Sequence, residues 1–246
     1  MKNNYYNLKS FKNIYSEPSE KSEVISQIIY GESFKIISKK KDWIKIKTNF
    51  DNYIGFIQKG KIFKNFNPTH KIFKKNSQIY KMHKGKLIKS KNFLSFASKL
   101  SVIRKNKNFV EFEPNRWVKK VEIKGIKHKF KDFKKIFNYF LNSKYKWGGK
   151  HFSGIDCSGL VQIFFYYNET FCPRDTIDQI PFFKKMKKDI FRIKKKLIFW
   201  KGHVAICMNK KTLIHAYGPR KKVVIMNINK TLVKIFKDTN LKPIYI

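Results

Sequence analysis

The sequence contains few cysteines, and those it has form no recognisable set. Only Cys157, Cys172 and Cys207 occur among the 246 residues, and their spacing does not repeat. An odd number of cysteines without a repeated spacing argues against a disulfide framework and against a zinc site. The sequence therefore indicates a reducing compartment, and we expect neither a metal ion nor another cofactor. We expect Cys207 in the core of a strand and Cys172 in a proline-containing loop without a role.

Long apolar runs are also missing. No segment approaches the ~18 consecutive apolar residues that a membrane-spanning helix needs. The N-terminal residues lack the apolar stretch of an export signal. We therefore expect a cytoplasmic protein with no membrane span.

Acidic residues and arginines are scarce as well. There are 16 Asp and Glu against 56 Lys and Arg, a formal net charge of +40. Such a charge suggests a polyanion partner, but very few of these cations are arginine, the residue suited to bidentate phosphate and base contacts. Lysine is abundant together with Asn, Ile, Phe and Tyr, the amino acids of A/T-rich codons. We therefore expect no specific nucleic-acid partner, although the charge can make the protein bind nucleic acid weakly.

The most informative segment that is present runs from Tyr145 to Leu160, with the sequence YKWGGKHFSGIDCSGL. Its glycines permit a tight backbone that approaches its neighbours closely. An apolar run begins at Leu160 and predicts a buried helix, so that Cys157 lies at the N-terminus of that helix. Backbone N–H groups and the helix dipole favour the thiolate there, and the thiolate is the nucleophile. The segment therefore predicts a cysteine nucleophile.

Two histidines could supply the base that this cysteine needs. Residues 197–207 have a strand-like apolar pattern broken at Gly202, and residues 212–216 form a second short strand. A turn at 209–211 would join them as a hairpin that places His203 and His215 on one side. One imidazole could then take the thiol proton while the other orients it. Alternatively, His215 is an ordinary core or surface histidine.

Four motifs in this half of the chain resemble one family. The motifs YxWGG, DCSG, GHV and IHA contain Tyr145, Cys157, His203 and His215 in that order, and they are similar to those of the NlpC/P60 cysteine peptidases, which share a papain-like core. The resemblance implies Cys157 as nucleophile, His203 as general base and later acid, and His215 as the group that orients His203. It also implies that Tyr145 lies beside the thiolate.

The implied reaction is acyl transfer to the cysteine. The thiolate attacks an amide carbonyl, a thioester forms with loss of the amine, and water releases the acid. Backbone N–H groups near Cys157 would stabilise the oxyanion. One departure is visible, because the family usually has Gly-Asp before the strand that leads to its histidine, where this sequence has Lys195 and Lys196 before Leu197.

The first half of the chain predicts small β-barrels. Short alternating strands over 22–32, 34–37, 42–47 and 51–57 resemble a bacterial SH3 domain. A weaker copy follows, with strands predicted at 78–80, 93–103, 109–112 and 116–118. The predicted fold class is α+β: two small SH3-like β-barrels followed by a papain-like NlpC/P60 catalytic domain. The predicted domains are 1–68, 69–126 and 127–246.

Enzymes that resemble this layout use the first barrel to close one end of the cleft. They cleave murein peptides with a free N-terminus, between γ-D-glutamate and the diamino acid. By this resemblance Asp156, Glu32 and Tyr53 would hold the α-ammonium of an N-terminal L-alanine, since a desolvated ammonium needs a paired carboxylate. The alternatives are a solvated turn for Glu32 and barrel packing for Tyr53.

The alanine and glutamate subsites complete the predicted site. By the same resemblance they would be lined by Trp147, Ser158 and Thr176. Alternatively, Ser158 bonds backbone groups at the helix start, its commonest role there.

The sequence therefore predicts a cysteine peptidase that hydrolyses the γ-D-glutamyl–diamino acid bond in cell-wall peptide recycling. Two other classes stay open: a binding module that holds wall fragments or nucleic acid without turnover, and a papain-like acyltransferase, because an amine can also resolve a thioester. The third-position diamino acid and the oligomeric state leave no signal in the sequence.

Overall fold

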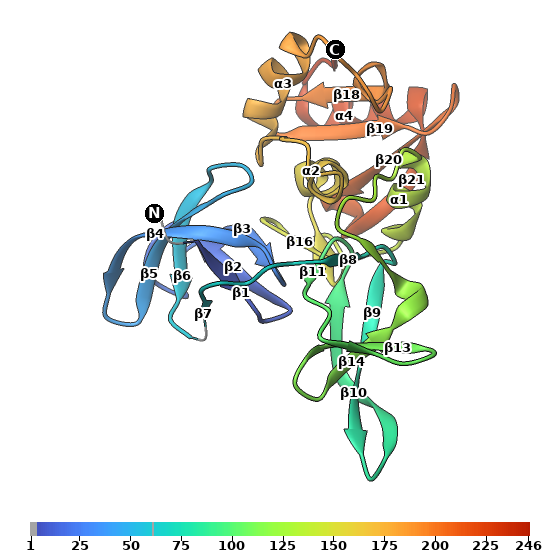
Figure 1. Ribbon diagram of the computed structural model, residues 1–246. Coiled ribbons are helices and arrows are strands. Elements are labelled where there is room, and N and C mark those ends of the chain that lie inside the picture. The colour runs from blue at the N-terminus through green and yellow to red at the C-terminus, as the bar shows by residue number, and fades with distance from the viewer. Residues whose placement is uncertain (1–3, 61) are drawn as a thin grey trace. The chain divides into compact units, whose positions relative to one another are not determined.

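The structure is a computed structural model that describes residues 4–60 and 62–246. The chain divides into two compact units, Met1–Lys129 and Phe130–Ile246. The first unit, drawn in blue to green in Figure 1, consists of strands and one short 3-10 helix in its described part. The α-helices of the described chain all lie in the second unit, which is drawn in green to red.

The first unit begins with a seven-stranded antiparallel sheet in the order β3-β2-β6-β5-β4-β1-β7. Its strands are β1 (Tyr5–Asn7), β2 (Phe11–Tyr15), β3 (Val24–Ile29), β4 (Ser33–Lys40), β5 (Trp43–Thr48), β6 (Ile54–Gln58) and β7 (Ile62–Phe63). Burial alternates along β5, where Ile44 and Ile46 are buried between more exposed neighbours. These side chains pack with Ile14, Phe34 and Ile57 into one core. The strands predicted within residues 22–57 are therefore confirmed.

Two further sheets follow in the same unit, in the orders β10-β9-β14-β13-β12 and β11-β8-β15. Their elements are β8 (His70–Ile72), β9 (Asn76–His83), β10 (Lys86–Ser95), β11 (Lys99–Leu100), β12 (Arg104–Lys105), β13 (Phe109–Glu113), β14 (Arg116–Lys119), the 3-10 helix η1 (Lys120–Glu122) and β15 (Ile123–Gly125). Ile79, Leu94, Leu100, Phe112 and Val118 form the core between them.

One predicted strand of this region is wrong. Residues 93–103 do not form a single strand, because β10 ends at Ser95 and Ala97 adopts a left-handed backbone with φ +66°. The chain then enters β11, which belongs to the other sheet and pairs with β8. A left-handed residue reverses the chain and cannot continue a strand. The polar segment before Phe93, which the sequence pattern left unassigned, forms most of β10 instead.

Tyr30 connects the first sheet of this unit to the core of the other two. It lies directly after β3, and its ring packs with Phe112 at 5.5 Å between centroids. Its hydroxyl donates to Glu113 Oε1 at 2.5 Å, and its backbone carbonyl accepts from the N–H of Lys99. The three sheets therefore share contacts within one unit. The predicted domain boundaries at 68 and 126 stay a prediction.

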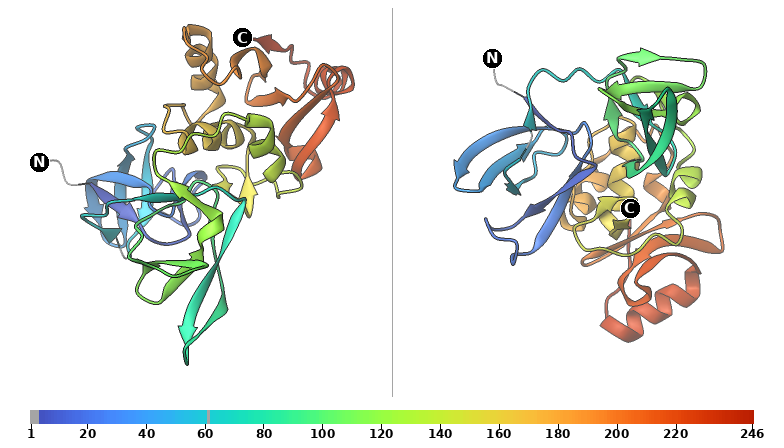
Figure 2. Two further views of the ribbon diagram at one scale, coloured as in Figure 1. Left: turned by 45° about the vertical axis from the view of Figure 1, so that its right-hand side comes forward. Right: turned by 90° about the horizontal axis from the view of Figure 1, so that it is seen from below.

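The second unit consists of α-helices around a five-stranded antiparallel sheet in the order β21-β20-β19-β18-β22. Its elements are α1 (Phe133–Tyr139), β16 (Lys150–His151), β17 (Gly154–Ile155), α2 (Cys157–Tyr167), α3 (Thr176–Lys185), η2 (Lys194–Lys196), β18 (Leu197–Trp200), β19 (His203–Cys207), β20 (Thr212–Tyr217), η3 (Gly218–Arg220), β21 (Lys222–Asn227), α4 (Ile228–Thr239) and β22 (Ile244–Tyr245). Figures 1 and 2 show α4 beside this sheet, where Ile235 packs on Ile198, Trp200 and Leu213.

The predicted hairpin is present in this sheet. Leu197 to Trp200 pair with Ile206 to His203, and Ile206 and Cys207 pair with Ile214 and Leu213. The turn between β18 and β19 contains Gly202 with φ +76°, where the sequence pattern was broken. The lysines that replace the usual Gly-Asp form the short helix η2 immediately before β18. No helix in the described part of the chain is long and apolar enough to cross a membrane.

Candidate active site

Cys157 is the first residue of α2, as predicted. Asp156 is the N-cap: its backbone is extended and its carboxylate accepts a hydrogen bond from the N–H of Gly159 at 2.6 Å. The apolar residues that follow, from Leu160 to Tyr167, are all buried. The helix is therefore anchored along its length in the core of the unit, and Cys157 lies at its fixed end.

The glycines of the motif allow the backbone to approach α2 closely. A Cβ added to Gly159 would lie 2.4 Å from the carbonyl oxygen of Gly149 and 2.8 Å from Asp156 Oδ1. A Cβ on Gly149 would lie 2.5 Å from the carbonyl oxygen of Gly154. Real Cβ atoms do not come this close to backbone atoms. The loop before Cys157 therefore rests directly on the first turn of α2, and the sequence needs glycine at both positions.

The thiol of Cys157 lies beside the backbone on both sides of His203. Its Sγ is 4.0 Å from the carbonyl oxygen of Gly202, and the N–H of Val204 is near enough to lower the pKa of the thiol. Burial, followed by the negative charge of Asp156, raises the pKa of the thiol to about 12, against the opposing effect of the Val204 and Ser158 N–H groups and Arg174. Desolvation therefore outweighs the predicted effect of the helix N-terminus, and the resting group is a neutral thiol.

His203 and His215 form a hydrogen-bonded pair, as the hairpin predicted. Nε2 of His203 lies 2.8 Å from Nδ1 of His215. Burial lowers the pKa of His203 to about 4, and burial together with the charge of His203 lowers that of His215 to about 3. Both rings are therefore neutral at pH 7, so one imidazole donates the shared proton and the other accepts it. His215 is completely buried.

Arg174 is a buried part of the site that sequence reasoning missed. Its guanidinium forms a bidentate ion pair with Asp156, at 3.0 Å to Oδ1 and 2.6 Å to Oδ2. It also donates to Ser158 Oγ at 2.8 Å and to the carbonyl oxygen of Gly149 at 3.4 Å. Arg174 is 2% exposed and Asp156 is 5% exposed. The available signal was an arginine two residues before Thr176 in a chain whose cationic residues are mostly lysine.

The remaining predicted residues of this unit lie around the same turn. Tyr145 is half-buried, and burial, followed by the charges of Cys157 and Asp156, raises the pKa of its phenol. Ser158 is buried and bonds Asp156 and Arg174, rather than backbone groups alone. Thr176 is buried at the start of α3, and Trp147 has an exposed fraction of 56%. The indole of Trp147 is therefore the most exposed of these four side chains.

Glu32 and Tyr53 belong to the first unit. Glu32 is 1% exposed, and its Oε2 accepts a hydrogen bond from the N–H of Ile29 at 3.0 Å. It is therefore a buried turn residue and not a solvated one. Tyr53 is half-buried before β6, and its backbone N–H donates to Thr48 Oγ1 at 2.8 Å. Their binding roles stay a prediction.

The other two cysteines lie outside this set of side chains. Cys207 is half-buried at the end of β19, against the core that contains Leu213. Cys172 is completely buried, and its carbonyl oxygen accepts a hydrogen bond from Gln162 at 3.1 Å. Its position is therefore structural and not incidental. Within the described residues, no group of three or more His, Cys, Asp and Glu side chains is placed to hold a metal ion.

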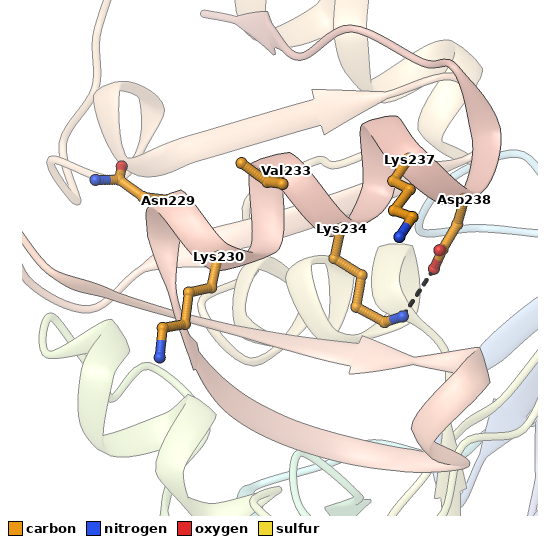
Figure 3. A pocket seen from close by; sticks show the side chains of 6 residues that line it. All are labelled: Asn229, Lys230, Val233, Lys234, Lys237 and Asp238. Atoms are coloured by element: carbon orange, nitrogen blue, oxygen red, sulfur yellow. Dashed lines mark ion pairs between the residues drawn. The ribbon is translucent and has the colours of Figure 1, made fainter.

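A separate hollow lies on the outer side of α4 (Figure 3). Its volume is about 520 Å³, and it is lined by Asn229, Lys230, Val233, Lys234, Lys237 and Asp238. Lys234 and Asp238 form an exposed ion pair at 2.9 Å. None of the predicted catalytic residues lines it, and exposed lysines on one helix are a solvated surface.

Two family models match separate parts of the chain. The NlpC/P60 family model matches residues 142–238, and the bacterial SH3 domain model matches residues 10–62. A curated relative from Lysinibacillus sphaericus, named dipeptidyl-peptidase 6, is 23% identical over an alignment of 231 residues, and the match covers 83% of this chain and 84% of the relative.

Two solved structures share the fold. An NlpC/P60 family protein from Bacillus cereus ATCC 10987 has a TM-score of 0.74 at 16% identity, and the match covers 92% of this chain and 94% of that one. An NlpC/P60 endopeptidase from Photobacterium damselae subsp. piscicida has a TM-score of 0.63 at 13% identity, over 98% of this chain and 70% of that one.

These findings confirm the predicted fold class, and the family match supports cell-wall peptidase activity. The buried cysteine, the histidine pair and the sequence match coincide in residues 142–238. The chain therefore combines a bacterial SH3 domain, matched at residues 10–62, with an NlpC/P60 domain, matched at residues 142–238.

Proposed function

We propose that the chain is a cysteine peptidase that hydrolyses the γ-D-glutamyl–diamino acid bond of murein peptides with a free N-terminal L-alanine. One observation carries the proposal: the Cys157 thiol contacts the backbone on both sides of His203, and His203 is hydrogen-bonded to His215. The name of the curated relative, dipeptidyl-peptidase 6, supports release of a dipeptide. Recycling of cell-wall peptides in the cytoplasm is the role that we infer for this activity.

The chemistry begins from neutral groups, because burial raises the pKa of Cys157 and lowers that of His203. His203 takes the thiol proton as Sγ attacks the amide carbonyl, so charge appears only when substrate fills the site. Backbone N–H groups at the start of α2 stabilise the oxyanion. The imidazolium protonates the leaving amine, which departs and leaves a thioester. Water, deprotonated by His203, then releases the acid and restores the thiol.

In this proposal Trp147, Ser158 and Thr176 line the alanine and glutamate subsites. The exposed indole of Trp147 supports a stacking contact with the peptide. Ser158 and Thr176 are buried in the first turns of α2 and α3, so their backbone groups are proposed to line the subsites as much as their hydroxyls do.

Asp156, Glu32 and Tyr53 are proposed to hold the ammonium of the N-terminal alanine. The charge of Asp156 is already matched by Arg174, which bonds both carboxylate oxygens. Asp156 can therefore contribute a lone pair but little net charge to the ammonium. The ammonium of the substrate is a second positive charge beside that of Arg174, and in this proposal the carboxylate of Glu32 matches it. Glu32 is therefore the decisive residue for binding the ammonium.

The test compares L-Ala-γ-D-Glu-diamino acid peptide with the same peptide acetylated on its amine, using mass spectrometry of the products. The free peptide should yield L-Ala-D-Glu. Acetylation should lower kcat/KM by roughly two to four decades, because the loss of a desolvated charged contact costs about 2–5 kcal/mol. Cys157→Ala should abolish product in both cases.

The Glu32→Gln variant separates a lost ammonium contact from general damage. It should lose more activity on the free peptide than on the acetylated one. Equal cleavage of the free and acetylated peptides by the wild-type chain would refute the ammonium assignment. Absence of cleavage, or transfer of the acyl group to an added amine in place of hydrolysis, would refute the proposed activity.

A further inference from the structure

His215 is held on three sides. Its Nδ1 faces Nε2 of His203 at 2.8 Å, and its ring stacks on Tyr217 at 4.6 Å between centroids with an interplanar angle of 10°. Its remaining nitrogen, Nε2, lies 3.3 Å from the thioether sulfur of Met226. The ring plane and both nitrogens are therefore fixed by neighbours within the same sheet.

Strand pairing places the Met226 sulfur opposite His215. On adjacent strands, Leu213 pairs with Met226 and His215 pairs with Val224, so His215 and Met226 are diagonal neighbours on one face of the sheet. Diagonal neighbours in an antiparallel pair are within reach of long side chains. Methionine is also flexible enough to place its sulfur at the ring edge. The contact thus follows from the register of β20 and β21.

A neutral imidazole carries a proton on only one of its two nitrogens. A thioether sulfur can accept a hydrogen bond but cannot donate one. If the proton of His215 were on Nδ1, the lone pair of Nε2 would face the lone pairs of Met226 Sδ. If the proton is on Nε2, it points at the sulfur, and Nδ1 becomes an acceptor. Met226 therefore favours the tautomer of His215 that carries its proton on Nε2.

This preference passes to His203. When Nδ1 of His215 is an acceptor, the hydrogen between the two rings must belong to Nε2 of His203. His203 is neutral, so its Nδ1 then carries a lone pair, which is what a base needs to take the thiol proton. With the opposite tautomer of His215, Nδ1 of His203 would carry a proton and could not act as the base.

We propose that Met226 is a positioning residue that sets the tautomers of the His203–His215 pair, so that His203 presents a lone pair at Nδ1 in the resting site. The proposal rests on the proposed function for its catalytic consequence. The tautomer assignment itself rests only on the contacts of His215, Met226 and His203.

The first test needs no turnover, and a substitution serves only to assign the signals. In the full chain labelled with ¹⁵N-histidine, the nitrogen shifts at pH 7 should show His215 protonated at Nε2 and unprotonated at Nδ1, with the signals assigned by comparison with His215→Asn. A proton on Nδ1 of His215 would overturn the proposal. If the tautomer is as expected but no murein peptide is cleaved, the proposed function fails and the tautomer assignment stands.

Substitutions of Met226 give a graded second test. Leucine has no acceptor, and Met226→Leu should lower kcat/KM by about three- to tenfold, the range of a sulfur contact, with KM nearly unchanged. Met226→Gln restores an acceptor oxygen and should retain more activity than Met226→Leu. Met226→Lys supplies only donors at a half-exposed position, and should favour the opposite tautomer and lower kcat by about a hundredfold or more.

The matched control is Met208→Leu, which removes another thioether from the same unit at a buried position next to β19. Near-ultraviolet circular dichroism should show that each variant keeps its tertiary structure. The proposal would be overturned if the Met226→Leu variant matched the Met208→Leu variant in kcat and in its ¹⁵N spectrum. It would also be overturned if the Met226→Lys variant kept the wild-type tautomer of His215.

Discussion

Arg174 offers the sharpest test of how the nucleophile is held. Arg174→Met removes a guanidinium that makes four hydrogen bonds: two to Asp156, one to Ser158 and one to the carbonyl of Gly149. Methionine keeps much of the apolar stem, so the main loss is the charge and its hydrogen bonds. Asp156 then remains as a buried anion bonded by Gly159 N–H and the Ser158 hydroxyl.

The expected loss follows from this burial. Side chains of Arg174 and Asp156 are 1% and 7% exposed, so removal of one partner should lower the free energy of unfolding by about 3–5 kcal/mol. Asp156→Asn alone leaves a buried cation and should cost a similar amount. In the double variant neither charge is stranded, so it should be more stable than the sum of the single losses implies, with a coupling energy of roughly 2–3 kcal/mol.

The assay is urea unfolding at pH 7, with alkylation of the buried Cys157 reporting on the catalytic unit. The control is Lys234→Met, which breaks an ion pair of 2.9 Å whose side chains are 42% and 41% exposed. That variant should lose less than about 1 kcal/mol. A loss for Arg174→Met as small as this, or strictly additive losses in the double variant, would show that the buried pair does not hold the turn before α2.

Three further predictions concern the catalytic groups. Cys157→Ala should lower kcat by at least about four decades, whereas Cys172→Ala should keep most of the activity; equal effects in a peptide-cleavage assay would contradict the assignment of the nucleophile. His203→Ala should lose several decades in kcat, and His215→Asn about one or two, because an amide oxygen can still accept the hydrogen bond; equal small losses would refute these roles. The pKa of buried His151 and of His215 is lowered by burial to about 4 and about 3, so the folded state favours their neutral forms. The unfolded chain binds more protons below its ordinary histidine pKa of about 6.5, so stability should be full above that pH. These two histidines should lower it by roughly 5 kcal/mol by pH 4.5, a loss that His215→Asn should reduce in urea titrations. Unfolding midpoints that are constant from pH 7 to 4.5 would contradict this.

The features that the sequence predicted correctly are those with strong local periodicity or tight spacing. The apolar run after Cys157 predicted α2, and the break at Gly202 predicted the turn before His203. The pairing of His203 with His215 followed from the alternation of side chains along two joined strands. In each case neighbours in the sequence determine the geometry.

The features that the sequence did not predict depend on contacts between distant segments. Arg174 reaches Asp156 across 18 residues, and no period in the sequence connects the two. The sulfur of Met226 meets His215 only because β20 and β21 pair in one particular register. The resting charge state of Cys157 was also outside the reach of sequence reasoning, since desolvation depends on the whole surrounding fold and here exceeds the local effect of the helix N-terminus.

The close contact between Gly149 and Gly159 helps to hold the backbone of the motif without any contribution from the Cys157 thiol. The backbone of this turn is fixed by two glycines, the Asp156 cap and Arg174, and the thiol of Cys157 supplies none of these contacts. Replacement of the sulfur by hydrogen or oxygen therefore leaves the binding surface in place while hydrolysis stops. A Cys157→Ala chain can thus serve as a trap that retains an uncleaved peptide. By the same reasoning, a descendant of this fold that lost its cysteine would begin as a ready-made receptor for the former substrate.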